Sequence, residues 1–218
     1  CGSFIITLIV TDSNGCTHDT TYNIFINCNP NAEFLWTRVC EGLPTPFFDN
    51  SSTIDPNFNI TSWEWNFGIT PGIDDMNQNP TYIYDSCGNN IFTVTLVVGD
   101  NQTPVNCYSS YQETISVACN PTAYITSDTV CLGDTTHFSG SLSISGGTDS
   151  IIAGGLYEPY TWQNSGGTAI PPLFDDSILY IFDNPGIQDS TRLIVMTTHG
   201  CSDTAWHRSY VRANPISG

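Results

Sequence analysis

The spacing of the nine cysteines constrains this 218-residue chain more than any other feature. The cysteines at positions 16, 28 and 40 return 91 residues later at positions 107, 119 and 131, and Cys201 follows Cys107 by 94 residues. Regular self-similarity at such a period indicates tandem modules rather than one large domain. The predicted units are residues 1–28, which hold only the last strands of a first unit, then residues 29–119 and residues 120–215. Because the first unit cannot close a core alone, we expect the chain to come from a longer array.

The residues around the cysteines repeat as well. Cys28-Asn29-Pro30 recurs as Cys119-Asn120-Pro121, and Val39-Cys40-Glu41-Gly42 recurs as Val130-Cys131-Leu132-Gly133. The repeat is therefore a property of the whole sequence and not of the cysteines alone.

Each unit has the pattern of an all-β fold. Residues 91–98 form a β-branched and aromatic run of strand length, and residues 4–10 match them in the first unit. Asn14-Gly15 lies between two such runs and predicts a tight hairpin, because both turn residues need a positive φ. Turn residues recur at short intervals, and no helical apolar period is present. This predicts β-sandwiches of about seven strands per unit.

Composition excludes several classes of protein. The chain carries 21 acidic and 4 basic residues, a formal charge of −17, and contains no lysine. A nucleic-acid or anionic-lipid surface needs cations, so we expect no binding to nucleic acid and no membrane insertion. No apolar run reaches the ~18 residues of a membrane span. Many cysteines with few cations indicate a secreted protein in an oxidising compartment. No two cysteines have the C-x-x-C spacing of a zinc site.

Three motifs of the second unit carry a family resemblance. They are Ser62-Trp63-Glu64-Trp65-Asn66-Phe67-Gly68, then Asn79-Pro80-Thr81-Tyr82-Ile83-Tyr84, then Phe92-Thr93-Val94-Thr95-Leu96. This unit resembles the polycystic kidney disease (PKD) domain, whose pattern is W-x-W-D-F-G-D-G, N-P-x-H-x-Y and Y-x-V-x-L. Asn66 replaces the family's Asp, and Tyr160-Thr161-Trp162 is a degenerate copy in the third unit. The resemblance implies tandem immunoglobulin-like β-sandwich modules.

The cysteine-bearing form of the repeat is similar to repeats of giant surface proteins of Bacteroidota, including gliding-motility adhesins. This resemblance implies an extracellular, cell-surface protein. Within the Trp motif, strand alternation places Trp63, Trp65 and Phe67 on one face. We expect that face to fill the core, with carbohydrate stacking as the alternative.

Two disulfides follow from the predicted hairpins. Cys1 and Cys87 come just before the penultimate strand of their units, and Cys28 and Cys119 come at the end of the last strand. Antiparallel pairing of these strands brings the start of one beside the end of the other. The third unit lacks both members of the pair. We therefore predict the disulfides Cys1–Cys28 and Cys87–Cys119.

The other cysteines leave two pairings open. Parity favours Cys40–Cys107 and Cys131–Cys201, with Cys16 bonded to a partner upstream of residue 1. Sandwich topology favours Cys40–Cys201 instead, because Cys40 and Cys107 should lie at opposite ends of their unit. We prefer the pairs within one unit, because they leave fewer cysteines without a partner.

No catalytic constellation is present in the sequence. It has no G-x-S-x-G, H-E-x-x-H or phosphate-loop motif. The four histidines, His18, His137, His199 and His207, fall near predicted strand ends. The carboxylate pairs Asp74-Asp75 and Asp175-Asp176 are adjacent and cannot straddle a glycosidic bond. We predict that the chain is not an enzyme.

Calcium is the one metal that the sequence suggests. Asp74, Asp75 and Asn77 lie together in the loop after the Trp motif, and hard cations bind such oxygen ligands. The alternative is a solvated acidic loop, since no spaced D-x-D-x-D pattern accompanies them.

Sugar attachment is a second candidate modification. Nine of the 16 aspartates precede Ser or Thr, and seven of these sites have an aliphatic residue or Thr in third place. The pattern is similar to an O-glycosylation motif of exported Bacteroidota proteins, although Asp-Ser and Asp-Thr also favour turns. The candidate hydroxyls are Thr20, Thr129, Thr135, Ser150, Ser177, Ser190 and Thr204.

Together these features predict a structural or adhesive segment of an extracellular stalk or filament. The expected partners are neighbouring repeats of the same protein, with self-assembly into filaments or contact with surface polysaccharide as further expectations. An accessory substrate-binding module of a secreted hydrolase is the alternative.

Overall fold

A computed structural model describes residues 1–87, 91–103, 105–147, 150–151, 160–164, 166, 168–170 and 176–216. The chain divides into two compact units. Unit 1 contains Cys1–Thr37, Thr45–Tyr82 and Ile91–Ile115, and unit 2 contains Arg38–Pro44, Ile83–Asn90 and Ser116–Gly218. The described residues form strands and turns. No helix among them has the length and hydropathy needed to cross a lipid bilayer.

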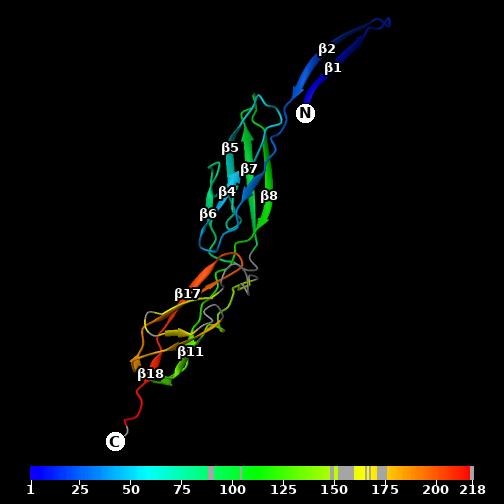
Figure 1. The fold of residues 1–218 in the computed structure, drawn as a ribbon. Coiled ribbons are helices and arrows are strands. Elements are labelled where there is room, and N and C mark those ends of the chain that lie inside the picture. Colours follow the sequence, from blue (N-terminus) through cyan, green and yellow to red (C-terminus); the bar gives the residue numbers. More distant parts are fainter. Residues whose placement is uncertain are drawn as a thin grey trace. The chain divides into compact units, whose positions relative to one another are not determined.

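Unit 1 begins with the predicted hairpin, labelled in Figure 1. Strand β1 (Gly2–Thr11) pairs antiparallel with β2 (Thr17–Ile26) through ten residue pairs, from Gly2–Ile26 to Thr11–Thr17. The turn uses Gly15 at φ +86°, a conformation that suits glycine. Apart from Gly2, every residue of both strands is exposed.

The described residues in the rest of unit 1 form two three-stranded sheets. One has the order β3-β4-β6 and the other β5-β7-β8, whose strands lie side by side in Figure 1. The strands are β3 (Phe34–Trp36), β4 (Pro44–Asp49), β5 (Ile60–Asn66), β6 (Thr81–Ile83), β7 (Phe92–Asp100) and β8 (Tyr108–Ile115). Strand β7 pairs antiparallel with both β5 and β8.

The core of unit 1 is built around the second tryptophan of the Trp motif. Trp65 is fully buried, and its ring centroid lies 5.3 Å from that of Phe34 and 5.7 Å from that of Phe47. Phe67 is also buried, so the predicted alternation holds. Trp63 is half-buried, and its Nε1 donates a hydrogen bond to Asp49 Oδ2 at 2.8 Å. The tryptophan motif therefore supplies both a core and an edge residue.

The glycine that ends the motif has a steric role. Gly68 has φ +81°, and a Cβ at this position would lie 2.7 Å from the carbonyl oxygen of Thr93. Only glycine allows the chain to turn this close to β7.

The described residues of unit 2 form three sheets. Their orders are β13-β14-β11-β9, β12-β16-β17 and β10-β18-β15. The strands are β9 (Thr126–Ser127), β10 (Val130–Cys131), β11 (Thr135–Ser139), β12 (Tyr160–Gln163), β13 (Thr168–Ile170), β14 (Ser177–Ile181), β15 (Gly186–Ile187), β16 (Thr191–Met196), β17 (Ser202–His207) and β18 (Tyr210–Arg212). Strands β10 and β18 pair parallel. The order β12-β16-β17 repeats the order β5-β7-β8 of unit 1.

The core of unit 2 takes apolar residues from both large sheets. Its members are Ile125, Phe138, Trp162, Ile178, Tyr180, Phe182, Leu193, Val195 and Val211. Burial raises the pKa of Tyr180 above its usual value. Both units are thus all-β sandwiches of the immunoglobulin-like kind, and the predicted fold class is confirmed.

Candidate functional site

Three disulfides cross-link this chain, two within single sequence repeats and one between two repeats. Cys1 bonds Cys28 with a Cα–Cα distance of 5.0 Å, next to the Gly2–Ile26 pair that ends the first hairpin. In unit 2, Cys87 bonds Cys119 at 5.1 Å. These are the two pairs that the sequence predicted. Three disulfides indicate that the protein matures in an oxidising compartment.

The preferred pairing of the remaining cysteines was wrong. Cys40 bonds Cys201 with a Cα–Cα distance of 5.7 Å, whereas Cys107 and Cys131 form no disulfide. Cys201 precedes β17, and Cys131 pairs with Arg212 at the far end of β18. The two strands and their connection span about 36 Å at ~3.3 Å per residue, whereas a disulfide needs Cα atoms within about 7 Å.

The same geometry excludes the bond between Cys40 and Cys107. Cys107 lies in the turn before β8, whereas Cys40 pairs in parallel with Ala118, three residues beyond the end of that strand. The length of β8 therefore separates Cys40 from Cys107 in the second repeat, just as β17 and β18 separate Cys131 from Cys201 in the third. Parity was a weaker guide than strand direction.

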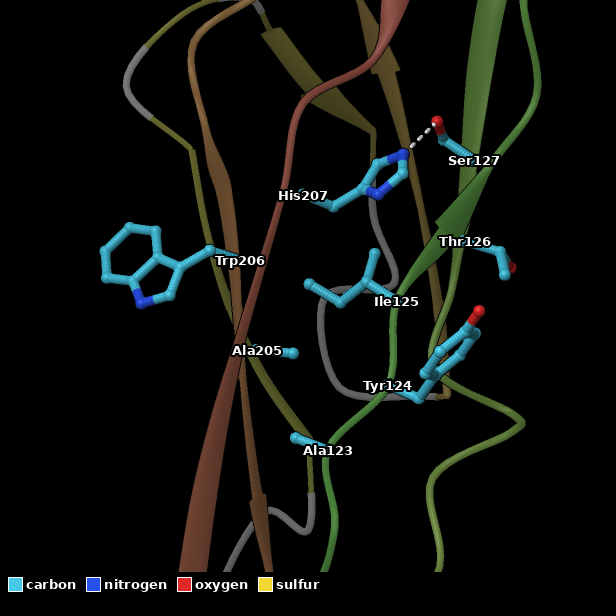
Figure 2. Close-up of a pocket in the computed structure, with 8 residues that line it drawn as sticks. All are labelled: Ala123, Tyr124, Ile125, Thr126, Ser127, Ala205, Trp206 and His207. Atoms are coloured by element: carbon cyan, nitrogen blue, oxygen red, sulfur yellow. Dashed lines mark hydrogen bonds between the residues drawn. The ribbon is translucent and has the colours of Figure 1, made fainter.

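An open groove lies along one edge of the unit 2 sandwich, and Figure 2 shows it in close-up. It has a volume of about 390 Å³ and runs between the segment that ends in β9 and strand β17. Its lining residues are Ala123, Tyr124, Ile125, Thr126, Ser127, Ala205, Trp206 and His207. In Figure 2, Ala205 and His207 point towards the β9 segment, and Trp206 points away from it.

The polar contact in this groove joins the two edges. Ser127 Oγ and His207 Nε2 lie 2.9 Å apart, and the imidazole ring packs edge-on against Phe138 at 6.3 Å between centroids. A serine–histidine contact alone is not a hydrolytic site, because acyl transfer also needs an oriented base and oxyanion donors. The contact holds β9 against β17.

Trp206 is an exposed tryptophan that borders both the groove and a second hollow. Its side chain is 64% exposed, and the guanidinium of Arg192 lies 5.6 Å from the ring centroid. A second hollow of about 250 Å³ lies beside it, lined also by Gln163, Asn164 and Ser190. An exposed aromatic face with nearby amide, hydroxyl and guanidinium groups suits a polar ring such as a sugar.

The loop proposed for calcium holds itself together by hydrogen bonds. Asp74 accepts one from the Phe67 backbone at 2.8 Å and one from Thr70 Oγ1 at 3.1 Å. Asp75 Oδ1 accepts from the Asn77 backbone at 2.7 Å. Among the described residues, no group of three or more His, Cys, Asp and Glu side chains could hold a metal ion. The carboxylates shape the loop through these hydrogen bonds, and the calcium site at Asp74, Asp75 and Asn77 stays a prediction.

The candidate glycosylation hydroxyls lie at or near the surface. Thr20, Thr129 and Ser150 are exposed, and the other four are partly exposed. Ser190 Oγ accepts a hydrogen bond from Arg208 Nε at 3.0 Å. Asp149, which precedes Ser150, and Asp175 fall outside the described residues. Thr135 and Ser177 lie on the same face of the β11–β14 pair, but the seven hydroxyls are not gathered at one place in the fold.

The four histidines are scattered over the fold. His18 is exposed on β2 and His137 on β11, whereas His207 lies in the groove. His199 lies two residues before Cys201, which bonds Cys40. The Nε2 atom of His199 lies 2.8 Å from Arg38 Nη1. No pair of histidines shares a site in the part of the chain described here.

Comparison with known proteins is consistent with this architecture. Residues 27–115 match the family model of the PKD domain. The PKD domain is a non-catalytic domain type, and the match covers less than half of the chain. No curated protein matches the chain.

Two solved PKD domains are similar to part of the chain. The PKD1 domain of Vibrio cholerae metalloprotease PrtV has 32% identity and a TM-score of 0.34, covering 41% of this chain and 98% of its own. The PKD1 domain of Vibrio anguillarum Epp has 25% identity and a TM-score of 0.35, covering 42% and 96%. Fibronectin(III)-like modules of Clostridium thermocellum CbhA reach 10% identity and a TM-score of 0.36, covering 83% and 95%. With TM-scores this low, the likenesses say nothing of function.

The groove and the exposed Trp206 had no signal in the sequence. Trp206 lies outside the PKD match, and its neighbours Arg192 and Gln163 come from two other strands. Only the register of β12, β16 and β17, which pairs Gln163 with Arg192 and Arg192 with Trp206, brings them together.

Proposed function

We propose that this chain is a structural or adhesive segment of an extracellular stalk or filament, built from tandem disulfide-bonded immunoglobulin-like repeats on a bacterial surface. It acts through its covalent continuity and its surface, and not as an enzyme. Its partners are neighbouring repeats of the same protein.

The observation that carries this proposal is the Cys40–Cys201 disulfide. Cys40 belongs to the second sequence repeat and Cys201 to the third, and their sequence separation is 161. A tension applied to the chain ends passes through this bond and bypasses the enclosed strands. Such a device suits a load-bearing polymer.

The exposed first hairpin supports the same proposal. Phe4, Ile6, Leu8 and Val10 of β1 are 47–57% exposed. The equivalent residues of β7 (Phe92, Val94, Leu96 and Val98) are at most 6% exposed, because β5 and the facing sheet cover them. Burying an apolar side chain of this size contributes a favourable free energy of ~1.5–3 kcal/mol. Packing of the hairpin against further strands of the same kind of module would therefore stabilise it.

Single-molecule force spectroscopy tests the load-bearing role. The disulfides Cys1–Cys28 and Cys40–Cys201 enclose all but about 30 residues of the 218. At up to ~3.6 Å per residue, the freely stretched part of the oxidised chain should reach roughly 100 Å, and the reduced chain should reach roughly 780 Å. An oxidised chain that releases most of its length would contradict the proposal.

Antibodies raised against the chain test the cellular role. On intact cells of the source organism they should label fibres outside the envelope, and their Fab fragments should reduce attachment to surfaces. Labelling restricted to the cytoplasm, or a secreted soluble enzyme carrying the label, would count against a surface stalk.

A second candidate function is that of an accessory module that binds polysaccharide for a secreted hydrolase. The exposed Trp206, with the hollow lined by Gln163, Asn164 and Arg192, favours it. Affinity electrophoresis in gels containing polysaccharide should show retardation that Trp206→Ala abolishes and Trp63→Phe does not. Equal mobility with and without every polysaccharide tested would remove this candidate.

A further inference from the structure

Three of the nine cysteines form no disulfide, and their positions follow a rule. Cys16 and Cys131 are exposed and Cys107 is partly exposed. Each occupies the place in its repeat that either Cys40 or Cys201 occupies in another. The one disulfide between sequence repeats therefore provides a template for the unpaired cysteines.

Cys131 is held as Cys40 is. Cys40 pairs in parallel with Ala118, and Cys131 pairs in parallel with Arg212. The carbonyl of Cys40 accepts a hydrogen bond from Leu43 N at 3.1 Å, and that of Cys131 accepts from Asp134 N at 3.0 Å. Both turns thus close three residues after the cysteine.

The asparagine of each repeat junction completes this match. Asn120 Nδ2 donates to the carbonyl of Glu41 at 3.3 Å, and Asn214 Nδ2 donates to the carbonyl of Leu132 at 3.0 Å. Glu41 and Leu132 directly follow Cys40 and Cys131. The same contacts therefore fix both cysteines, and both present their thiols from the same turn.

Cys16 and Cys107 are held as Cys201 is. Each lies at the end of a hairpin turn, which joins β1 to β2 for Cys16, β7 to β8 for Cys107 and β16 to β17 for Cys201. The carbonyl of Cys201 accepts a hydrogen bond from Thr197 N at 2.8 Å. The carbonyls of Cys16 and Cys107 accept the equivalent bond from Asp12 N and Asp100 N, each at 3.0 Å.

The two aspartates hold these turns further. Asp12 Oδ1 accepts from Cys16 N at 2.9 Å, and Asp100 Oδ1 accepts from Cys107 N at the same distance. Asp100 is fully buried and also accepts from Gln102 N at 3.2 Å. These contacts fix the backbone of both cysteines without using the sulfur.

We propose that each of the three unpaired cysteines is one half of a further disulfide equivalent to Cys40–Cys201. We call Cys40 and Cys131 the V-C-x-G cysteines of their repeats, and Cys16, Cys107 and Cys201 the hairpin-turn cysteines. In this arrangement the V-C-x-G cysteine of one repeat bonds the hairpin-turn cysteine of the repeat that follows it. Cys131 takes the hairpin-turn cysteine of a following repeat. Cys107 and Cys16 each take the V-C-x-G cysteine of the repeat before their own. The complementary cysteines lie outside these 218 residues, so the three thiols stay unpaired here.

The chemistry is thiol–disulfide exchange with an oxidised dithiol carrier. The thiolate of one cysteine attacks the carrier disulfide, and the second cysteine displaces the reduced carrier from the mixed disulfide. The two cysteine thiols lose two electrons and two protons, and the carrier disulfide becomes two thiols. The exposure of Cys16 and Cys131 gives the carrier access.

A concatemer tests the proposal. Residues 1–215 are followed by residues 31–119 of a second copy, so that a whole repeat follows Pro215 as Asn31 follows Pro30. After oxidation with a glutathione redox couple, non-reducing peptide mapping should find Cys131 bonded to Cys107 of the second copy. In the unfused chain Cys131 should be alkylated by iodoacetamide, and in the concatemer this alkylation should be lost almost completely.

The matched control carries Cys107→Ser in the second copy only, and there Cys131 should again be alkylated. Cys131 that stays alkylated in the concatemer, or that bonds Cys40 of the second copy, would overturn the proposal. The Cys40–Cys201 bond in the same molecule reports correct folding.

A second measurement needs no fusion. The oxidised unfused chain at high concentration should form intermolecular Cys131–Cys16 or Cys131–Cys107 bonds. Predominant Cys131–Cys131 dimers, as expected from random collision of exposed thiols, would also contradict the proposal. Neither test depends on adhesion, so a failure here is separate from a failure of the proposed function.

Discussion

Truncation of Trp65 to alanine tests the account of the unit 1 core most directly. The side chain is fully buried, with its ring centroid 5.3 Å from that of Phe34, 5.7 Å from that of Phe47 and 6.2 Å from that of Phe67. Its Nε1 donates a hydrogen bond to the carbonyl of Asn77 at 2.9 Å. The substitution removes the central ring of an aromatic cluster.

The expected cost follows from the lost burial and the cavity. A buried Trp→Ala change lowers the free energy of unfolding by ~3–5 kcal/mol. The lost hydrogen bond adds little, because Asn77 is exposed and water can replace the donor. A domain of this size has ~5–15 kcal/mol in total, and each kcal/mol shifts its Tm by ~4–8 °C. The Tm of unit 1 should therefore fall by roughly 15–30 °C.

Differential scanning calorimetry of the oxidised chain measures this shift, with Trp206→Ala as the matched control. Trp206 is 64% exposed, so its truncation should change the free energy of unfolding by less than ~1 kcal/mol. If Trp65→Ala lowers the Tm no more than Trp206→Ala does, the central place of Trp65 in the core is refuted.

Three further changes have defined outcomes. Replacing Cys87 and Cys119 together by alanine, which opens a loop with a sequence separation of 32, should lower the free energy of unfolding by about 4 kcal/mol in a urea titration; an unchanged midpoint would argue against the bond. Asp74→Ala removes two hydrogen bonds, one of them from Phe67 N, and should cost ~1–3 kcal/mol, whereas EDTA should leave the unfolding midpoint of the unsubstituted chain unchanged. A fall with EDTA would support the calcium site instead. Because burial raises the pKa of Tyr180, its stabilising effect is complete below the ordinary tyrosine pKa and is lost as pH rises through the raised value. The Tm of the alkylated chain, measured between neutral and alkaline pH, should therefore fall less steeply with pH for Tyr180→Phe than for the unsubstituted chain. Identical slopes of Tm against pH would exclude this contribution.

The repeat and the strands could be predicted from sequence because their signals are local. Asn14-Gly15 requires a positive φ, and the turn between β1 and β2 has it at Gly15. The alternation that places Trp65 and Phe67 on one face survives folding, because a strand has a period of two. The hairpin disulfides Cys1–Cys28 and Cys87–Cys119 follow from antiparallel pairing alone.

Features that join distant segments could not be predicted in this way. The sequence offered two partners for Cys40, and counting cysteines favoured the wrong one. The hydrogen bonds by which Asp74 and Asp75 shape their loop were likewise not visible in the sequence, where the two residues suggested only a calcium site. The hollow beside Trp206 forms from three strands whose register no local pattern specifies.

The sequence by itself determined the repeat, the β-sandwich class, the oxidising compartment and the place of each cysteine within its repeat, because spacing and alternation depend only on neighbours along the chain. The tertiary structure alone decided that Cys40 bonds Cys201 and that Cys107 and Cys131 stay unpaired. The physical reason is distance: a disulfide requires Cα atoms within about 7 Å, and which cysteines come that close depends on strands that pair far apart in sequence.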